Sequence, residues 1–218
     1  MFRCSVKLDT IYGLEYIKGA AMPHRIGRER LISELLERLQ DNPIIAAVRD
    51  DEGMKAALIS EVTTIFLLNS DIFNLKHLVK EIQERGKSAC VHMDFVEGLG
   101  SDGRAVDYIA EKIQPDGIIS TRGNLIRRAK EKGLFAIQRF FLIDSQSYRT
   151  AIRQVQSGKP DMIEVMPGVM PDVISRICKE VRIPVIAGGL VDSKRDIIGI
   201  LKAGAVGASI GKIGLWSL

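Results

Sequence analysis

The chain has 218 residues, a formal net charge of +4 at pH 7, 46% hydrophobic residues and 27% charged residues. This composition is that of an ordinary globular protein, and no apolar run is long enough to cross a bilayer. Three cysteines that lie far apart, Cys4, Cys90 and Cys178, exclude a disulfide framework and favour a reducing cytoplasm. The small positive excess permits nucleic-acid binding without requiring it.

The first 27 residues show no steady hydrophobic period. We interpret them as an N-terminal extension, either a leader or a poorly ordered segment, and we see no secretory signal in them. A helix is predicted from Arg28 to Gln40, because leucines recur every four positions at Leu31, Leu35 and Leu39. We expect this helix to cover the amino-terminal end of the fold that follows.

From there to the carboxyl terminus, short apolar runs alternate with helical patterns. The runs recur roughly every 20 to 28 residues, which leaves room for one crossover helix between successive parallel strands. Three predicted helices end in glycine, at Gly86, Gly133 and Gly204. The candidate strands are Ile44–Arg49, Val62–Asn69, Ser88–Asp94, Asp116–Thr121, Phe135–Leu142, Asp161–Pro167, Pro184–Ala187 and Val206–Ile210. The pattern predicts an α/β fold, a (β/α)8 TIM barrel in one domain over residues 28–218; an open doubly wound sheet is the alternative.

The last two strands are followed by glycine turns, Gly188-Gly189 and Ser209-Ile210-Gly211-Lys212. In (β/α)8 barrels the loops after strands seven and eight often bind phosphate, because glycine lets backbone N–H groups approach its oxygens. Ser209 would add a hydroxyl donor, Lys212 a positive charge, and Gly168 a tight turn after strand six. The sequence therefore predicts that a small phosphorylated ligand binds at this end. The alternative is that the glycines serve only tight turns.

Polar side chains also lie in the middle strands. Arg139 is expected to be buried and needs a carboxylate or an anionic ligand, and Glu164 on the next strand can pair with it. The sequence leaves open whether this pair is structural or contacts a hydroxylated ligand. His92 and Asp94 alternate on a predicted strand and so should share one face. With Glu97 or Glu164 as a third ligand they could bind a metal, but we favour a hydrogen-bonded polar pair.

Taken together, these strand ends resemble the glycerol-3-phosphate-responsive antiterminator family, which regulates bacterial glycerol-uptake operons. The likeness runs from about Pro43 to Trp216 and rests on several segments in this order. They are His92-Met93-Asp94, Gly117-Ile118-Ile119-Ser120-Thr121-Arg122, Ala136-Ile137-Gln138-Arg139, Ile163-Glu164-Val165-Met166-Pro167-Gly168, Ala187-Gly188-Gly189 and Lys202-Ala203-Gly204-Ala205.

The resemblance implies a cytoplasmic sensor that binds glycerol 3-phosphate and then acts on leader mRNA, so that a transcription terminator does not form. It implies no cofactor, no metal, no membrane partner and no catalytic residue. The expected ligand-binding residues are Asp94, Arg139, Glu164, Gly168, Gly188, Gly189, Ser209 and Gly211. RNA would contact basic side chains outside the ligand site, either Arg122, Arg127, Arg128, Lys130 and Lys132, or Arg25, Arg28 and Arg30. Either group could equally be an ordinary solvated helix face.

A phosphate-binding enzyme on the same scaffold is the competing hypothesis, either a phosphosugar isomerase or epimerase, or a glycerophosphodiester phosphodiesterase. Asp94 or Glu164 would then be the general base and His92 the acid. A Schiff-base aldolase is not expected, since no predicted strand carries a well-placed lysine. The fold alone does not choose between a sensor and an enzyme.

Overall fold

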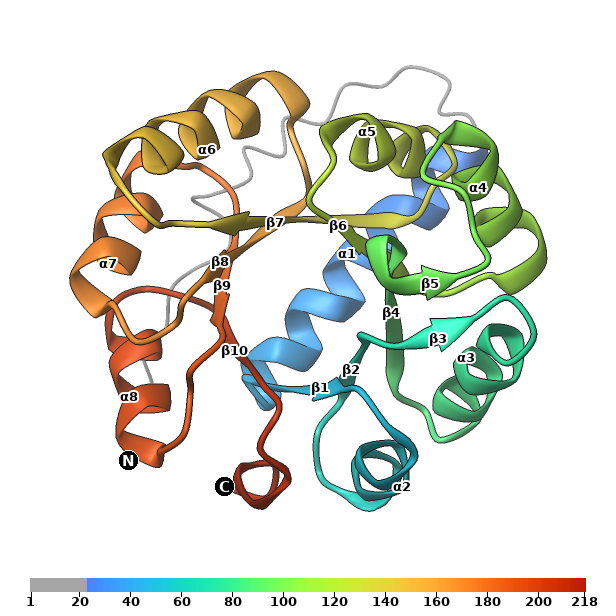
Figure 1. Ribbon diagram of the computed structural model, residues 1–218, viewed down its shortest axis with the longest axis horizontal. Helices are drawn as coiled ribbons and strands as arrows, with labels where there is room; N and C mark the ends of the chain where they lie inside the picture. Colours follow the sequence, from blue (N-terminus) through green and yellow to red (C-terminus); the bar gives the residue numbers. More distant parts are fainter. Residues whose placement is uncertain (1–22) are drawn as a thin grey trace.

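The computed structural model describes residues 23–218, with side chains from Arg30 onward. Among these residues, parallel strands close into a barrel surrounded by helices (Figure 1). Neighbouring strands follow the order β1-β10-β9-β8-β7-β6-β4-β2, so the first and last strands pair with each other. The predicted (β/α)8 barrel is therefore confirmed.

The barrel strands are β1 (Ile44–Val48), β2 (Thr64–Leu67), β4 (Ser88–His92), β6 (Gly117–Ser120), β7 (Phe135–Phe141), β8 (Met162–Met166), β9 (Val185–Gly188) and β10 (Gly207–Ile210). The α-helices are α1 (Pro23–Asp41), α2 (Asp51–Ile59), α3 (Leu75–Glu84), α4 (Gly103–Tyr108), α5 (Gly123–Glu131), α6 (Ser145–Gly158), α7 (Pro171–Glu180) and α8 (Lys194–Lys202). A π-helical turn, η3 (Ile109–Ile113), continues α4. The strands predicted from sequence are all present and differ from the predictions only at their ends.

Alternation along the strands builds two separate cores. Side chains such as Ile45, Phe66 and Cys90 point into the barrel and form one buried cluster. Their neighbours in sequence, such as Ala46 and Ile65, face the surrounding helices and belong to a second cluster. Because both faces are buried, the strands read as nearly continuous apolar runs.

Helix α1 closes the amino-terminal end of the barrel (Figure 1). Leu35, Leu36 and Leu39 are buried in the cluster that fills the barrel interior. The backbone oxygen of Arg38 accepts a hydrogen bond from Thr63, which lies in the loop before β2. The predicted covering helix is therefore present at the predicted end.

The start of α1 differs from the prediction. The helix begins at Pro23, whereas the sequence pattern placed its start at Arg28. Residues 23–27 of the expected extension are thus helical in backbone. The rest of that extension, including an expected leader, lies outside the described residues, and the division at residue 27 stays a prediction.

A second difference concerns the third strand of the barrel. We expected it to run to Asp94, but β4 ends at His92 and a 3-10 turn, η2 (Met93–Phe95), follows. After it, β5 (Val96–Glu97) pairs in parallel with β3 (Ser70–Asp71) in a small ladder outside the barrel. Strand alternation therefore does not extend to Asp94, and the expectation that it shares a strand face with His92 is wrong.

The carboxyl terminus is anchored next to the last strand. Trp216 follows a 3-10 turn, η4 (Ile213–Leu215), and is 1% exposed. Its indole Nε1 donates to the backbone oxygen of Ile210 at 2.8 Å. This contact fixes the segment after β10, which includes Gly211. No helix in residues 23–218 is both long and apolar enough for a membrane span.

Candidate ligand site at the carboxyl end of the barrel

A buried polar network lies in the upper part of the barrel interior. Arg139 on β7 and Glu164 on β8 are in register, and their side chains are 4% and 0% exposed. Arg139 Nε donates to Glu164 Oε2 at 2.5 Å, and Ser209 Oγ on β10 donates to Glu164 Oε1 at 2.5 Å. The pairing of Arg139 with Glu164 predicted from sequence is confirmed, whereas a ligand role for these three residues stays a prediction.

Gly188 on β9 makes room for this network. A Cβ atom at position 188 would collide with Ser209 Oγ and would lie 3.1 Å from Glu164 Oε1. Any side chain here would push the serine away from the carboxylate. The absence of a side chain at Gly188 is therefore needed for the buried hydrogen bonds.

The guanidinium of Arg139 keeps unused donors. A guanidinium carries five N–H bonds, and only the one on Nε has an acceptor among the described residues. The two Nη nitrogens have no acceptor among the described residues, and they are not fully buried. They can therefore donate to an anionic or hydroxylated ligand that enters the barrel mouth.

Free backbone N–H groups follow the last two strands. Gly189 and Leu190 come after β9 with φ angles of 76° and 59°, and Gly211 and Lys212 come after β10. None of these four N–H groups donates to an acceptor in residues 23–218. Because β9 and β10 are neighbours, the two pairs lie on one stretch of the rim. Clustered free amides of this kind form anion-binding concavities.

Gly168 differs from the other predicted glycines. Its N–H donates to the Gly189 oxygen at 3.0 Å. A Cβ at this position would lie 3.0 Å from Val191 and 3.1 Å from Ile200, so the residue is tightly packed between the ends of β8 and β9. Gly168 therefore holds the turn of Gly189 in place, and a direct contact with a ligand stays a prediction.

Asp94 organises the neighbouring part of the rim. It accepts hydrogen bonds from Ser120 Oγ at 2.7 Å and from the backbone N–H and Oγ1 of Thr121, both at 2.8 Å. Burial raises the pKa of this carboxyl, but the hydrogen bonds from Thr121 and Ser120 outweigh it, and the net shift is downward. Asp94 is therefore an ionised anchor for the turn after β6, with both oxygens already engaged.

His92 is buried beneath the rim and has no hydrogen-bond partner. The residue is 1% exposed, its ring stacks on Phe95 with centroids 4.2 Å apart, and neither ring nitrogen has a partner in the described chain. Burial and the nearby positive charge of Arg139 lower the pKa of His92 to about 3, with Asp94 opposing the shift. The imidazole is therefore neutral at physiological pH and poorly suited to act as an acid.

The metal interpretation gains no support. Within residues 23–218, no group of three or more His, Cys, Asp or Glu side chains is placed to hold a metal ion. Glu97, one of the two expected third ligands, lies in the small β3–β5 ladder and is exposed.

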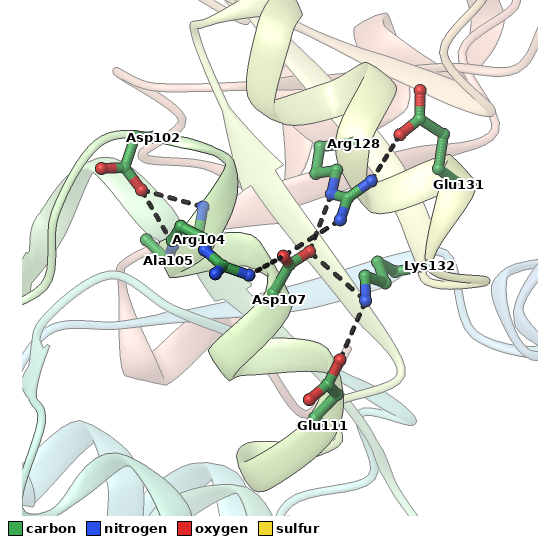
Figure 2. A network of polar contacts seen from close by, with 8 residues as sticks. All are labelled: Asp102, Arg104, Ala105, Asp107, Glu111, Arg128, Glu131 and Lys132. Atoms are coloured by element: carbon green, nitrogen blue, oxygen red, sulfur yellow. Dashed lines mark hydrogen bonds and ion pairs between the residues drawn. The ribbon is translucent and has the colours of Figure 1, made fainter.

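The basic residues predicted to bind RNA are largely neutralised by acidic neighbours (Figure 2). Arg128 on α5 contacts Asp107 on α4 at 2.7 Å and Glu131 at 2.9 Å. Lys132 contacts Glu111 at 2.9 Å and Asp107 at 3.4 Å. These contacts join α4 to α5, so the expected dense positive group is not a free patch at these positions.

The remaining members of the two basic groups are dispersed. Lys130 lies 3.4 Å from Asp161, Arg122 lies 3.9 Å from Asp94, and Arg30 pairs with Glu34 at 2.7 Å. Arg127 is exposed and has no carboxylate within 4 Å in the described chain. The side chains of Arg25 and Arg28 lie outside the described residues. A role of either group in RNA binding stays a prediction.

Comparisons with known proteins show the family of this chain. A family model described as glycerol-3-phosphate responsive antiterminator matches residues 44–216. The chain belongs to this family. The family is one of regulators and not of enzymes. Barrel enzymes also share the fold, but at 17% sequence identity or less, which shows the fold alone.

Three relatives are similar over most of the antiterminator barrel. A crystal structure of the glycerol uptake operon antiterminator regulatory protein from Listeria monocytogenes str. 4b F2365 has a TM-score of 0.78 and 38% identity, covering 81% of this chain and 95% of the other. A glycerol uptake operon antiterminator-related protein from Thermotoga maritima MSB8 has a TM-score of 0.71 and 36% identity, covering 79% and 96%. The protein YgcP of Escherichia coli K12 is 37% identical over 184 residues, which are 84% of this chain and 96% of YgcP.

The sequence did not single out every residue of the candidate site. Leu190 was missed because a leucine gives no sign of a left-handed φ angle.

Removing the charge of Glu164 tests the buried ion pair. Glu164→Gln leaves the Arg139 charge buried without a counter-charge and is expected to lower the free energy of unfolding by about 3–5 kcal/mol. Urea unfolding followed by circular dichroism measures this loss. The matched control, Arg139→Met combined with Glu164→Leu, removes both charges and should recover most of it. An equal loss in both variants would show that the charge pair is not the stabilising element.

A second prediction concerns the pH dependence caused by His92. The pKa of His92 is about 3 in the folded state and about 6.5 in the unfolded chain. As pH falls below 6.5 the unfolded state binds the proton first, so the stabilisation present above this pH is lost progressively down to about pH 3. His92→Phe removes this term. We expect the difference in the free energy of unfolding, wild type minus variant, to be constant above pH 7 and to fall between pH 6.5 and 4. A difference that stays constant over the whole range would contradict the prediction.

Proposed function

We propose that this protein senses glycerol 3-phosphate at the carboxyl end of its barrel and, with the ligand bound, acts on the leader mRNA of glycerol-metabolism genes to prevent transcription termination. The observation that carries the ligand proposal is the set of free N–H groups after β9 and β10, next to an arginine with unused donors. Membership of the family supports the effector and the regulatory role.

The phosphate would bind to the amides of Gly189, Leu190, Gly211 and Lys212. Four free N–H donors on one stretch of the rim suit a phosphate ester dianion, since each oxygen can accept more than one hydrogen bond. The Lys212 ammonium, whose Nζ donates to the Asp192 oxygen at 2.9 Å, adds positive charge to the same segment. Gly211 adds no side chain that would occupy this space.

The glycerol hydroxyls would bind to the buried network. A hydroxyl can accept from an Arg139 Nη group, and Glu164, which is fully covered, would orient that guanidinium through its hydrogen bond to Nε. Asp94 would act indirectly, by holding Thr121 in its turn. A ligand that has both a phosphate and hydroxyl groups therefore fits better than phosphate or glycerol alone.

The enzyme alternative has less support from the site. A general acid should have a pKa near the working pH, whereas the pKa of His92 is about 3. Glu164 and Asp94, the two candidate bases, both accept hydrogen bonds on each of their oxygens. The Listeria and Thermotoga relatives, named as proteins of glycerol uptake operon antitermination, support regulation.

Placing a negative charge on the rim tests the phosphate site. A Cβ at Gly211 would lie 3.8 Å from the backbone oxygen of Ala47 and would have no other neighbour within 4 Å. A side chain is therefore tolerated there. Gly211→Asp should weaken glycerol 3-phosphate binding by about tenfold or more, because a carboxylate close to a dianion is repelled. Gly211→Asn, the neutral isostere, should stay within about threefold of the wild type. Isothermal titration calorimetry with glycerol 3-phosphate, glycerol and inorganic phosphate measures both variants; equal affinities for Asp and Asn would exclude this rim as the phosphate site.

Coupling between effector and RNA tests the regulatory role. Sensing requires that glycerol 3-phosphate raise the affinity for leader RNA, typically by about 5- to 150-fold, and that RNA raise the affinity for the effector by the same factor. Gel-shift titration of a leader RNA with and without saturating glycerol 3-phosphate measures this factor. Identical RNA affinities in the two titrations would remove the antitermination model.

A further inference from the structure

A groove runs between helices α6 and α7 on the outside of the barrel. Its upper part is a hollow of about 480 Å³ lined by residues such as Leu142, Tyr148 and Met170. Its lower part is a hollow of about 560 Å³ lined by residues such as Val155 and Pro160. Glu180 lines both hollows, so the two are neighbours along the wall, and together they are called the groove. The same two helices contact each other less than α7 and α8 do.

The groove is lined by more cations than anions. Its cations are Arg149 and Arg176 in the upper part and Lys130, Lys159 and Arg182 in the lower part. Its anions are Asp144, Asp161 and Glu180. Five positive and three negative groups leave a positive surplus in a depression that also has an apolar floor. The phosphodiester backbone of a nucleic acid suits such a lining.

The anions of the groove are already engaged, and most of its cations are free. Asp144 accepts from the backbone N–H groups of Gln146 and Ser147 at the start of α6, and Glu180 accepts from the Tyr148 hydroxyl at 2.8 Å. Lys130 pairs with Asp161. The other four cations, Arg149, Lys159, Arg176 and Arg182, are exposed and have no carboxylate within 4 Å in residues 30–218. They differ in this respect from Arg128 and Lys132 on α5.

Two side chains with planar groups, Arg176 and Tyr148, lie next to each other in the groove lining. The Arg176 guanidinium lies over the Tyr148 ring, with Cζ 4.9 Å from the ring centroid. Both groups can stack on nucleobases, and a basic groove with stacking groups is the usual platform for a single strand. Such a strand exposes its base faces for stacking, whereas the bases of a duplex are already stacked on one another.

From these features we infer that the groove between α6 and α7 binds a single-stranded segment of the leader RNA. Arg149, Lys159 and Arg182 contact its phosphates, and the Arg176–Tyr148 pair contacts its bases. The inference rests on the proposed function, which supplies the RNA, and it adds the surface where that RNA lies.

The upper end of the groove is connected to the ligand site. Leu142 and Ile143 follow β7, which carries Arg139, and Met170 follows β8, which carries Glu164. The Leu142 N–H donates to the Met166 oxygen at 2.8 Å and so joins the two strand ends. A ligand that repositions Arg139 or Glu164 therefore acts on the segments that form the groove entrance, which provides a physical route for coupling.

Paired charge removals test the groove in the full chain. The groove variant is Lys159→Gln with Arg182→Gln, and the matched control is Lys76→Gln with Lys112→Gln, which removes the same charge from exposed residues of α3 and η3. Fluorescence anisotropy with a labelled leader RNA and saturating glycerol 3-phosphate is measured at several salt concentrations. The groove variant should bind about tenfold more weakly or worse. Its slope of log affinity against log salt should fall by about 1.4, since each lost single-strand phosphate contact removes about 0.7. The control should stay within about twofold of the wild type.

Calorimetry with glycerol 3-phosphate confirms that both variants retain the ligand site. Arg176→Gln, a single change in the upper part, should also weaken RNA binding. If the groove variants bind RNA like the wild type, or if the control weakens binding as much as they do, the groove inference is overturned while the proposed function stands. If the wild type binds no leader RNA in the presence of glycerol 3-phosphate, both fail.

Discussion

The ion pair between Arg139 and Glu164 inside the barrel is the constraint on which the candidate site depends. Two charges removed from water cost several kcal/mol each, and they persist only when their geometry and hydrogen bonds offset this cost. Ser209 supplies the additional hydrogen bond to the carboxylate, and the absence of a side chain at Gly188 makes that contact possible. The arginine is thereby held with donors to spare at the mouth of an otherwise apolar barrel.

The sequence predicts much of this molecule, for identifiable reasons. Continuous apolar runs at regular spacing determine the barrel, and an arginine within one of them requires a carboxylate nearby, so Arg139 and Glu164 could be paired in advance. Asp94 could not be placed, because a 3-10 turn after His92 depends on tertiary contacts with Ser120 and Thr121. Asp107 and Glu111, the carboxylates that pair with Arg128 and Lys132, are likewise 21 residues away from these cations in the sequence and come close to them only in the fold.

The two helix pairs on the barrel wall show how similar basic sequences reach different electrostatic outcomes. Between α4 and α5, alternating charges form a network that joins the helices and leaves little free potential (Figure 2). Between α6 and α7, Asp144 and Glu180 accept hydrogen bonds from backbone amides or a tyrosine. Asp161 pairs with Lys130, and the other four cations of the groove have no carboxylate within 4 Å in residues 30–218. Counting basic residues along the chain cannot distinguish these cases, because the partner of each carboxylate decides whether a cation is free.

Helix α1, whose leucines plug one end of the barrel, leaves the opposite end as the exit for a bound metabolite. A macromolecule lying across that exit would trap the metabolite, and the regulator would respond slowly when its concentration drops. In the proposed arrangement, an RNA strand bound along the outer wall leaves this exit uncovered. The effector could then leave before the transcript is released, and the lifetime of the complex would follow the cellular concentration of the metabolite.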